Sequence, residues 1–232
     1  MRALAPLRAL LLLLVLLPAA GPVQARAADG EAPAATGALT TEAVFAKVRA
    51  AYGDAKTVQA AFEQTQKGFS FPAPVVRTGR LELKKPNKLR MAFDEPADAY
   101  LFDGEQFVRV DGTAKEAWVY RSAGNALQRI FDFFVGEAVL DRDFAVSVVA
   151  DGPERVDGMH VLRLDARNED AGIRTAYLRV AADSGRITGL VTETPFGDRT
   201  TTLLKDLVLD GVLDDARFTW SDKDGWRTVA GD

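Results

Sequence analysis

The chain contains no cysteine and only one histidine among its 232 residues. The missing cysteines exclude a disulfide framework, thiol catalysis and thiolate metal sites. They also exclude an N-terminal cysteine that could carry a lipid anchor. The single histidine, His160, lies in an alternating run with Leu162 and Leu164. We therefore expect a half-buried strand residue at this position, with a catalytic base as the alternative.

Motifs that carry chemistry are equally scarce. The sequence has no Gly-x-Ser-x-Gly nucleophile elbow and no glycine-rich phosphate loop. The stretch 222–225, Asp-Lys-Asp-Gly, matches only part of a calcium loop and is predicted to be a turn. Carboxylate pairs for glycoside hydrolysis depend on the fold, so the sequence leaves them open. We expect a protein that is not an enzyme and that binds no metal or cofactor.

Long apolar runs are absent apart from one at the N-terminus. Arg2 and Arg8 flank the start of this region, the apolar run covers 10–17, and the small-residue stretch ends in Val-Gln-Ala at 23–25. This order predicts a cleaved signal peptide over residues 1–25, with an uncleaved membrane anchor as the alternative. The mature chain is then expected to be soluble in an exported compartment.

The charge balance argues against a nucleic-acid partner. The whole chain carries 29 basic and 33 acidic residues, for a net charge of −4. Without Arg2 and Arg8 of the predicted signal peptide, 27 basic residues face 33 acidic ones, and the net charge becomes −6. An acidic protein is poorly suited to binding nucleic acid or coating an anionic lipid surface.

A flexible leader and a helix precede the main pattern. Residues 26–38 lack any large apolar side chain and predict a flexible leader. A helix is expected from Thr40 or Thr41, which are placed to cap it, to Gly53, which is placed to end it. Its apolar stripe has helical spacing and consists of Val44, Phe45, Val48, Ala51 and Tyr52.

After Gly53 the apolar residues recur with a period of two, which predicts strands. Asp-Gly and Pro turns separate these short runs, as in an antiparallel meander. The runs predict about 11 strands, the last of them over 218–220, in a mainly β fold with two or three helices. A sheet of this size must twist and then close, split into a sandwich or stay a curved half-barrel. The periodicity does not distinguish these three outcomes.

One segment interrupts the meander. Over residues 125–137 the apolar positions recur at helical spacing, and Phe133 lies off the stripe, so this helix is apolar on more than one face. It is either an ordinary core helix or a lid whose inner face covers an apolar cavity. The stripe consists of Leu127, Ile130, Phe131 and Phe134.

Several short motifs occur in one order between residues 40 and 110. They are Phe-Glu-Gln at 62–64, Gly-x-Leu-x-Leu at 79–83, Lys-Pro-Asn at 85–87 and Asp-Gly at 103–104. Together they resemble the periplasmic outer-membrane lipoprotein carrier family, LolA. The ending at 214–220, Asp-Asp-Ala-Arg-Phe-Thr-Trp, is similar to the family's Asp-x-x-Phe-x-Phe.

The resemblance implies an open, strongly curved antiparallel half-barrel with a helical lid over its concave face, formed by a single carrier domain over residues 39–232. It also implies a monomeric periplasmic carrier that takes lipoproteins from the inner to the outer membrane by holding their acyl chains. The implied partners are an ATP-driven lipoprotein-releasing transporter in the inner membrane and a lipidated acceptor in the outer membrane. The missing cysteine fits the carrier and not the acceptor.

Residue roles follow from the same alignment of motifs. The cavity is expected to be lined by alternating apolar residues of three strands: Leu81, Leu83, Leu89, Met91, Phe93 and Phe107. The stripe Leu127, Ile130, Phe131 and Phe134 would form the lid. In the family an arginine in this turn holds the lid shut, and here the position is Lys85, which is either a weaker latch or a solvated turn residue. The alternatives to lipoprotein transport are a binder of another lipid or glycolipid and a lipid-sensing interaction domain.

Overall fold

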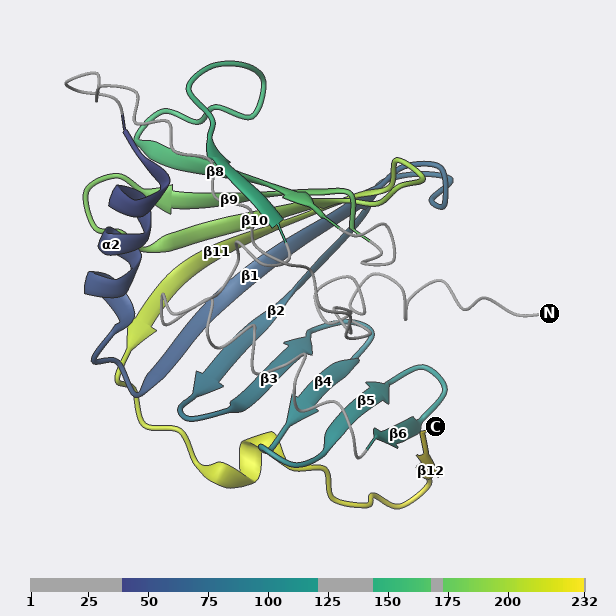
Figure 1. The fold of residues 1–232 in the computed structure, drawn as a ribbon. Coiled ribbons are helices and arrows are strands. Elements are labelled where there is room, and N and C mark those ends of the chain that lie inside the picture. The colour runs from purple at the N-terminus through teal and green to yellow at the C-terminus, as the bar shows by residue number, and fades with distance from the viewer. Residues whose placement is uncertain (1–38, 121–143, 168–172, 232) are drawn as a thin grey trace, which may run out of the picture.

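A computed structural model describes residues 39–120, 144–167 and 173–231, and these form one large curved sheet with a helix at one end (Figure 1). The helix is α2 (Thr41–Tyr52). The strands are β1 (Thr57–Lys67), β2 (Val75–Lys84), β3 (Lys88–Phe93), β4 (Ala99–Phe102), β5 (Phe107–Asp111), β6 (Glu116–Tyr120), β7 (Phe144–Val148), β8 (Met159–Ala166), β9 (Thr175–Ala181), β10 (Ile187–Glu193), β11 (Arg199–Leu209) and β12 (Arg227–Ala230).

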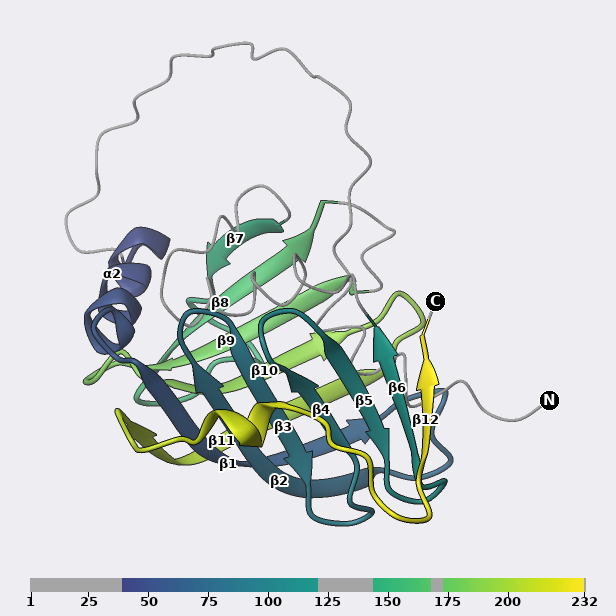
Figure 2. The same ribbon diagram turned by 90° about the horizontal axis from the view of Figure 1, so that it is seen from below.

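The 12 strands follow the order β12-β6-β5-β4-β3-β2-β1-β11-β10-β9-β8-β7. Neighbouring strands are antiparallel except for β12, which runs parallel to β6. The sheet curves strongly, but β7 and β12 do not meet, so it remains an open half-barrel (Figure 2). The expected fold class is confirmed, and the structure chooses the open form over closure or a sandwich.

Helix α2 forms where its caps predict. The Oγ1 of Thr40 accepts a hydrogen bond from the backbone N–H of Ala43 at 3.2 Å, and the N–H of Gly53 donates to the carbonyl of Arg49. The buried side of the helix carries Val44, Val48 and Tyr52. The hydroxyl of Tyr52 accepts a hydrogen bond from the backbone N–H of Ile187 at 3.0 Å, which ties the end of the helix to the start of β10.

One part of the predicted strand pattern is wrong. The predicted strand over 218–220 is absent, because a 3-10 helix, η2 (Asp215–Phe218), occupies this region and Phe218 is buried. The side chain of Asp214 accepts the N–H of Ala216, and this capping favours a helical turn over an extended chain. Strands β4 and β12 have four residues each, too few for a period of two to identify them in the sequence.

The C-terminal segment covers the convex side of β3 to β6. Trp220 and Trp226 pack there against a second buried cluster that contains Leu101, Val108, Val110 and Ala117. The buried carboxylate of Glu82, on β2, pairs with both Arg90 and Arg217. Hydrogen bonds from Lys84 and Lys88 lower the pKa of the Asp215 carboxyl to about 2. The segment is therefore attached to the sheet by both apolar and ionic contacts.

The predicted signal peptide (1–25), leader (26–38) and lid helix (125–137) lie outside the described residues. Within the described ranges, neither α2 nor η2 is long and apolar enough to cross a membrane.

Candidate functional site

The six residues predicted to line the cavity lie together on the concave face of the sheet. Register places Leu81 beside Met91 and Leu83 beside Leu89 across the β2–β3 pair. Leu89 pairs with Phe102 on β4, and Phe102 pairs with Phe107 on β5, so Phe107 lies on the same face. All six side chains belong to one buried apolar cluster, with exposed fractions between 2% and 9%. Their role as a lipid lining remains a prediction, but the structure brings them into one surface.

A row of aromatic rings crosses this face from β1 to β6. Phe62 meets Phe93 edge-on at a centroid distance of 5.1 Å, and Phe93 meets Tyr100 at 6.1 Å. Tyr100 stacks on Phe107 at 6.2 Å, and Phe107 lies 5.9 Å from Tyr120. Tyr100 lies in the middle of the row, and burial raises the pKa of its hydroxyl, so this ring is uncharged at neutral pH. The row forms a continuous apolar surface.

Sequence reasoning missed the other half of this face. The buried cluster continues through α2 and across β8, β9 and β10, where it includes Leu162, Leu164, Ala176, Leu178, Val180 and Ile187. Alternation along each strand marks these residues as facing one side. That this side is the one that carries Phe93 follows only from the pairing of β1 with β11, which joins the two halves.

Polar groups mark the limits of the apolar surface. On β1 the side chain of Gln64 is buried and donates to the hydroxyl of Thr202 on β11 at 3.2 Å. On β2 the guanidinium of Arg77 lies 3.8 Å from the centroid of the Phe93 ring and pairs with Asp98 at 2.9 Å. Because Arg77 alternates with Gly79 and Leu81, its position on this face could have been found from the sequence.

Lys85 contacts the end of helix α2. Its ammonium group donates to the carbonyl oxygen of Gly53 at 2.7 Å and to that of Tyr52 at 3.3 Å. Among its described neighbours, therefore, Lys85 holds the helix C-terminus, where a cation also complements the helix dipole. The four predicted lid residues lie outside the described residues, and the predicted contact between Lys85 and the lid stays a prediction.

We expect Lys85→Met to lower the free energy of unfolding by about 1 kcal/mol, because two helix-end carbonyls lose their charged donor. Lys85→Arg should retain most of the stability, since a guanidinium can reach the same oxygens. Urea unfolding followed by far-UV circular dichroism measures both. Equal stability of the methionine variant and the parent would show that this contact contributes nothing.

The remaining motif residues hold the turns beside Lys85. The side-chain amide of Asn87 donates to the carbonyl of Gly104 at 3.3 Å, and Gly104 has a φ of 109°, which favours glycine. The carboxylate of Asp103 accepts the backbone N–H groups of Glu105 and Gln106. The Lys-Pro-Asn and Asp-Gly motifs are thus two turns fastened to one another at one end of the concave face.

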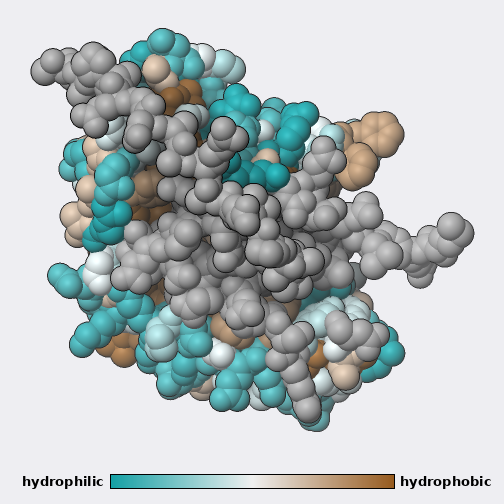
Figure 3. All heavy atoms as spheres, in the orientation of Figure 1, coloured by the Kyte–Doolittle hydropathy of each residue, from teal (hydrophilic) through white to brown (hydrophobic). Residues whose placement is uncertain are grey.

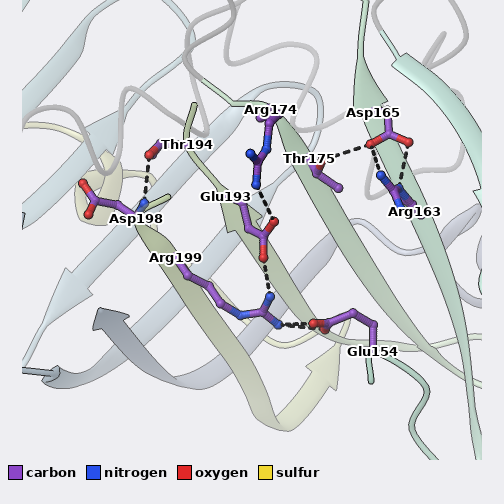
Figure 4. A network of polar contacts seen from close by, with 9 residues as sticks. All are labelled: Glu154, Arg163, Asp165, Arg174, Thr175, Glu193, Thr194, Asp198 and Arg199. Carbon is purple, nitrogen blue, oxygen red and sulfur yellow. Dashed lines mark hydrogen bonds and ion pairs between the residues drawn. The ribbon is translucent and has the colours of Figure 1, made fainter. Parts of the chain in front are cut away.

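The opposite face of β8 to β11 is polar (Figure 4). There Arg199 pairs with Glu154 at 2.7 Å and with Glu193 at 2.6 Å. Arg163 pairs with Asp165, which also accepts the hydroxyl of Thr175. These hydrogen bonds lower the pKa of the Asp165 carboxyl, against the opposing effect of its burial. In this half, the sheet therefore separates a charged convex surface from an apolar concave one.

The chemistry available on the concave face is apolar contact. His160 lies on β8 and pairs with Val180 in the register, so it is the strand residue that the alternation predicts. Across the described ranges, no group of three or more His, Asp or Glu side chains is arranged to hold a metal ion. The arrangement offers shape and apolar area for a ligand such as a hydrocarbon chain.

An open, curved β-sheet with an apolar concave face and a helix at one end defines the structural class. The family model of the outer membrane lipoprotein carrier protein LolA matches residues 53–221. This match covers well over half of the 232 residues, and the chain belongs to the LolA family. None of the curated proteins matches the sequence.

Several solved structures are similar to this chain at low sequence identity. An uncharacterized conserved protein from Thermus thermophilus is 10% identical, with a TM-score of 0.53 over 82% of this chain and 98% of its own. A LolA superfamily protein from Nitrosomonas europaea is 14% identical, with a TM-score of 0.42 over 79% and 99%. The lipoprotein LppX from Mycobacterium tuberculosis is 13% identical, with a TM-score of 0.44 over 75% and 98%. At 10% sequence identity, the Thermus structure supports the fold alone.

Proposed function

We propose that the protein is a soluble periplasmic carrier that binds the acyl chains of lipoproteins on its concave face and shuttles them from the inner to the outer membrane. The observation that supports this most is the continuous apolar concave surface on an open sheet, in a member of the LolA family. The carrier unit would span residues 39–232, after the predicted signal peptide and the flexible leader.

The physical requirement for such a carrier is apolar area without directional bonding. Burial of a hydrocarbon chain stabilises by about 0.8 kcal/mol per CH₂ group, so an acyl chain strongly favours an apolar surface over water. Leu81, Met91 and Phe93 would supply that surface on one half of the sheet, and Leu162 and Leu178 on the other. Binding and release then require no catalysis, only a partner that holds the chains more or less tightly.

The partners proposed for loading and unloading are those of the family: an ATP-driven lipoprotein-releasing transporter and an outer-membrane acceptor. The predicted lid residues 127–134 would cover the apolar surface when no cargo is bound, because an exposed patch of this size promotes aggregation.

A photo-crosslinking amino acid at position 91 should capture acylated lipoprotein in cells, since Met91 lies on the concave face. The matched control is position 208, where Val208 is 51% exposed and pairs with Gln59 on the opposite face. No lipoprotein should be captured there. Failure to capture lipoprotein at positions 83, 91 and 107 alike would overturn the proposal. If mass spectrometry after detergent-free purification identifies a bound glycolipid or phospholipid, that lipid and not a lipoprotein is the ligand.

A further inference from the structure

Two hairpin turns project together from the end of the sheet opposite α2 (Figure 1). One connects β1 to β2 over residues 68–74, and the other connects β10 to β11 over 194–198. The backbone N–H of Ser70 donates to Asp198 Oδ1 at 2.9 Å, and the hydroxyl of Ser70 donates to the other carboxylate oxygen. We call this joined pair of turns the hairpin tip.

The hairpin tip exposes large apolar side chains. Phe69 is 94% exposed and Phe196 is 77% exposed, and Val76 at the start of β2 is 59% exposed. The space-filling view shows an apolar projection at the place of these turns (Figure 3). Exposure of two phenylalanines on projecting turns is costly in water, and such features mark interaction sites.

Charge is missing from the same place. Residues 68–76, Gly-Phe-Ser-Phe-Pro-Ala-Pro-Val-Val, contain no ionisable side chain, although 27% of the whole chain is charged. Thr194 to Gly197 on the second turn are also uncharged. The carboxylate of Asp198 is occupied by Ser70, which satisfies it within the tip. Asp198 keeps its negative charge, but it is hydrogen-bonded within the tip, and insertion of the Phe69 and Phe196 rings alone does not require this carboxylate to leave water.

We infer that the hairpin tip docks the protein reversibly onto a lipid bilayer by inserting Phe69 and Phe196 into the interfacial region. A protein partner of ordinary size would need about 800 Å² on each side with a polar rim, and a narrow uncharged point does not offer this. A bilayer interface needs no complementary shape, accepts aromatic side chains and leaves shallow backbone groups hydrated.

The charge pattern also determines which lipids bind. The two turns contain no Lys or Arg, and of the cations at their base Arg199 is paired with Glu154 and Glu193, which leaves Lys67 as the exposed one. Because one exposed cation is not a cluster and the chain is acidic overall, attraction to anionic headgroups contributes little. Insertion depends on apolar contact, so the protein should bind neutral and anionic bilayers equally well. Salt should have little effect on the partition coefficient. The inference is independent of the proposed carrier function, because the tip can bind a bilayer whether or not the concave face holds a lipid.

The test is flotation of the signal-peptide-free chain with phosphatidylcholine vesicles. The parent should float with the vesicles, and Phe69→Ser combined with Phe196→Ser should reduce the partition coefficient at least tenfold. The matched control is Val212→Ser, since Val212 is 99% exposed but lies in the C-terminal segment, and it should float like the parent. Vesicles with added phosphatidylglycerol should give the same values.

Two further measurements make the outcome decisive. The double variant should melt at the parent's temperature, because both side chains are exposed, and it should still bind a fluorescent fatty acid on the concave face. Equal flotation of the double variant and the parent, or no flotation of the parent, would overturn the docking inference alone. If the parent does not bind the fatty acid, this counts against the carrier function and leaves the docking result intact. Capture of a protein through position 69, without vesicle binding, would make the tip a protein contact and also overturn the inference.

Discussion

Met91→Lys is expected to lower the affinity for a fluorescent fatty acid about a hundredfold. The side chain of Met91 is 7% exposed and lies at the centre of the concave face, between Leu81 on β2 and Tyr100 on β4. An ammonium group there must either stay hydrated and exclude the acyl chain or be buried beside it without a partner. The second arrangement costs several kcal/mol, and about 2.7 kcal/mol corresponds to a hundredfold loss.

Fluorescence titration measures the dissociation constant, and Val208→Lys is the matched control. It adds the same charge at a half-exposed position on the opposite face and should leave the affinity unchanged. Where Met91→Lys does not fold, Met91→Gln has nearly the same length without the charge and should cost about tenfold. Unchanged affinity in a folded Met91 variant would show that the fatty acid does not bind on the concave face.

Gly79→Val is expected to prevent folding, and Gly79→Ala should cost about 3 kcal/mol or more of unfolding free energy. A Cβ at position 79 would lie 2.0 Å from the carbonyl oxygen of Ala92 and 2.6 Å from Cζ of Phe62. The first contact is with backbone on the paired strand β3, so β2 and β3 would have to separate locally. The loss is large compared with a total stability of about 5–15 kcal/mol for ordinary domains.

Thermal and urea unfolding of Gly79→Ala measure this effect, with Arg80→Ala as the control on the same strand, because Arg80 is exposed. Adding Phe62→Leu to Gly79→Ala should restore little stability, since the backbone contact with Ala92 remains. An alanine variant as stable as the parent would show that the β2–β3 pair relaxes at no cost. The result also gives a physical reason for the glycine in the Gly-x-Leu motif: the aromatic ring of Phe62 fills the space above it.

Local features of this fold could be predicted from the sequence because they depend on neighbours in the chain. Thr40 and Gly53 set the ends of α2, and the period of two set the facing of Leu81, Leu83 and Met91. The same local reasoning failed at Phe218. Its alternation with Trp220 is typical of a strand, but the Asp214 side chain caps the 3-10 helix η2, which contains Phe218. It also left the choice between closure, sandwich and half-barrel open.

By itself, therefore, the sequence determined the helix caps, the turns and which residues share one side of each strand. Only the tertiary structure decided which sides of the different strands form one surface. Strands β1 and β11 are far apart in the sequence, and their pairing joins two meanders into one open sheet. The hairpin tip has the same origin, since Ser70 and Asp198 lie 128 positions apart and meet only once those strands pair. Contacts between such distant segments depend on the packing of the whole sheet, and no local pattern encodes them.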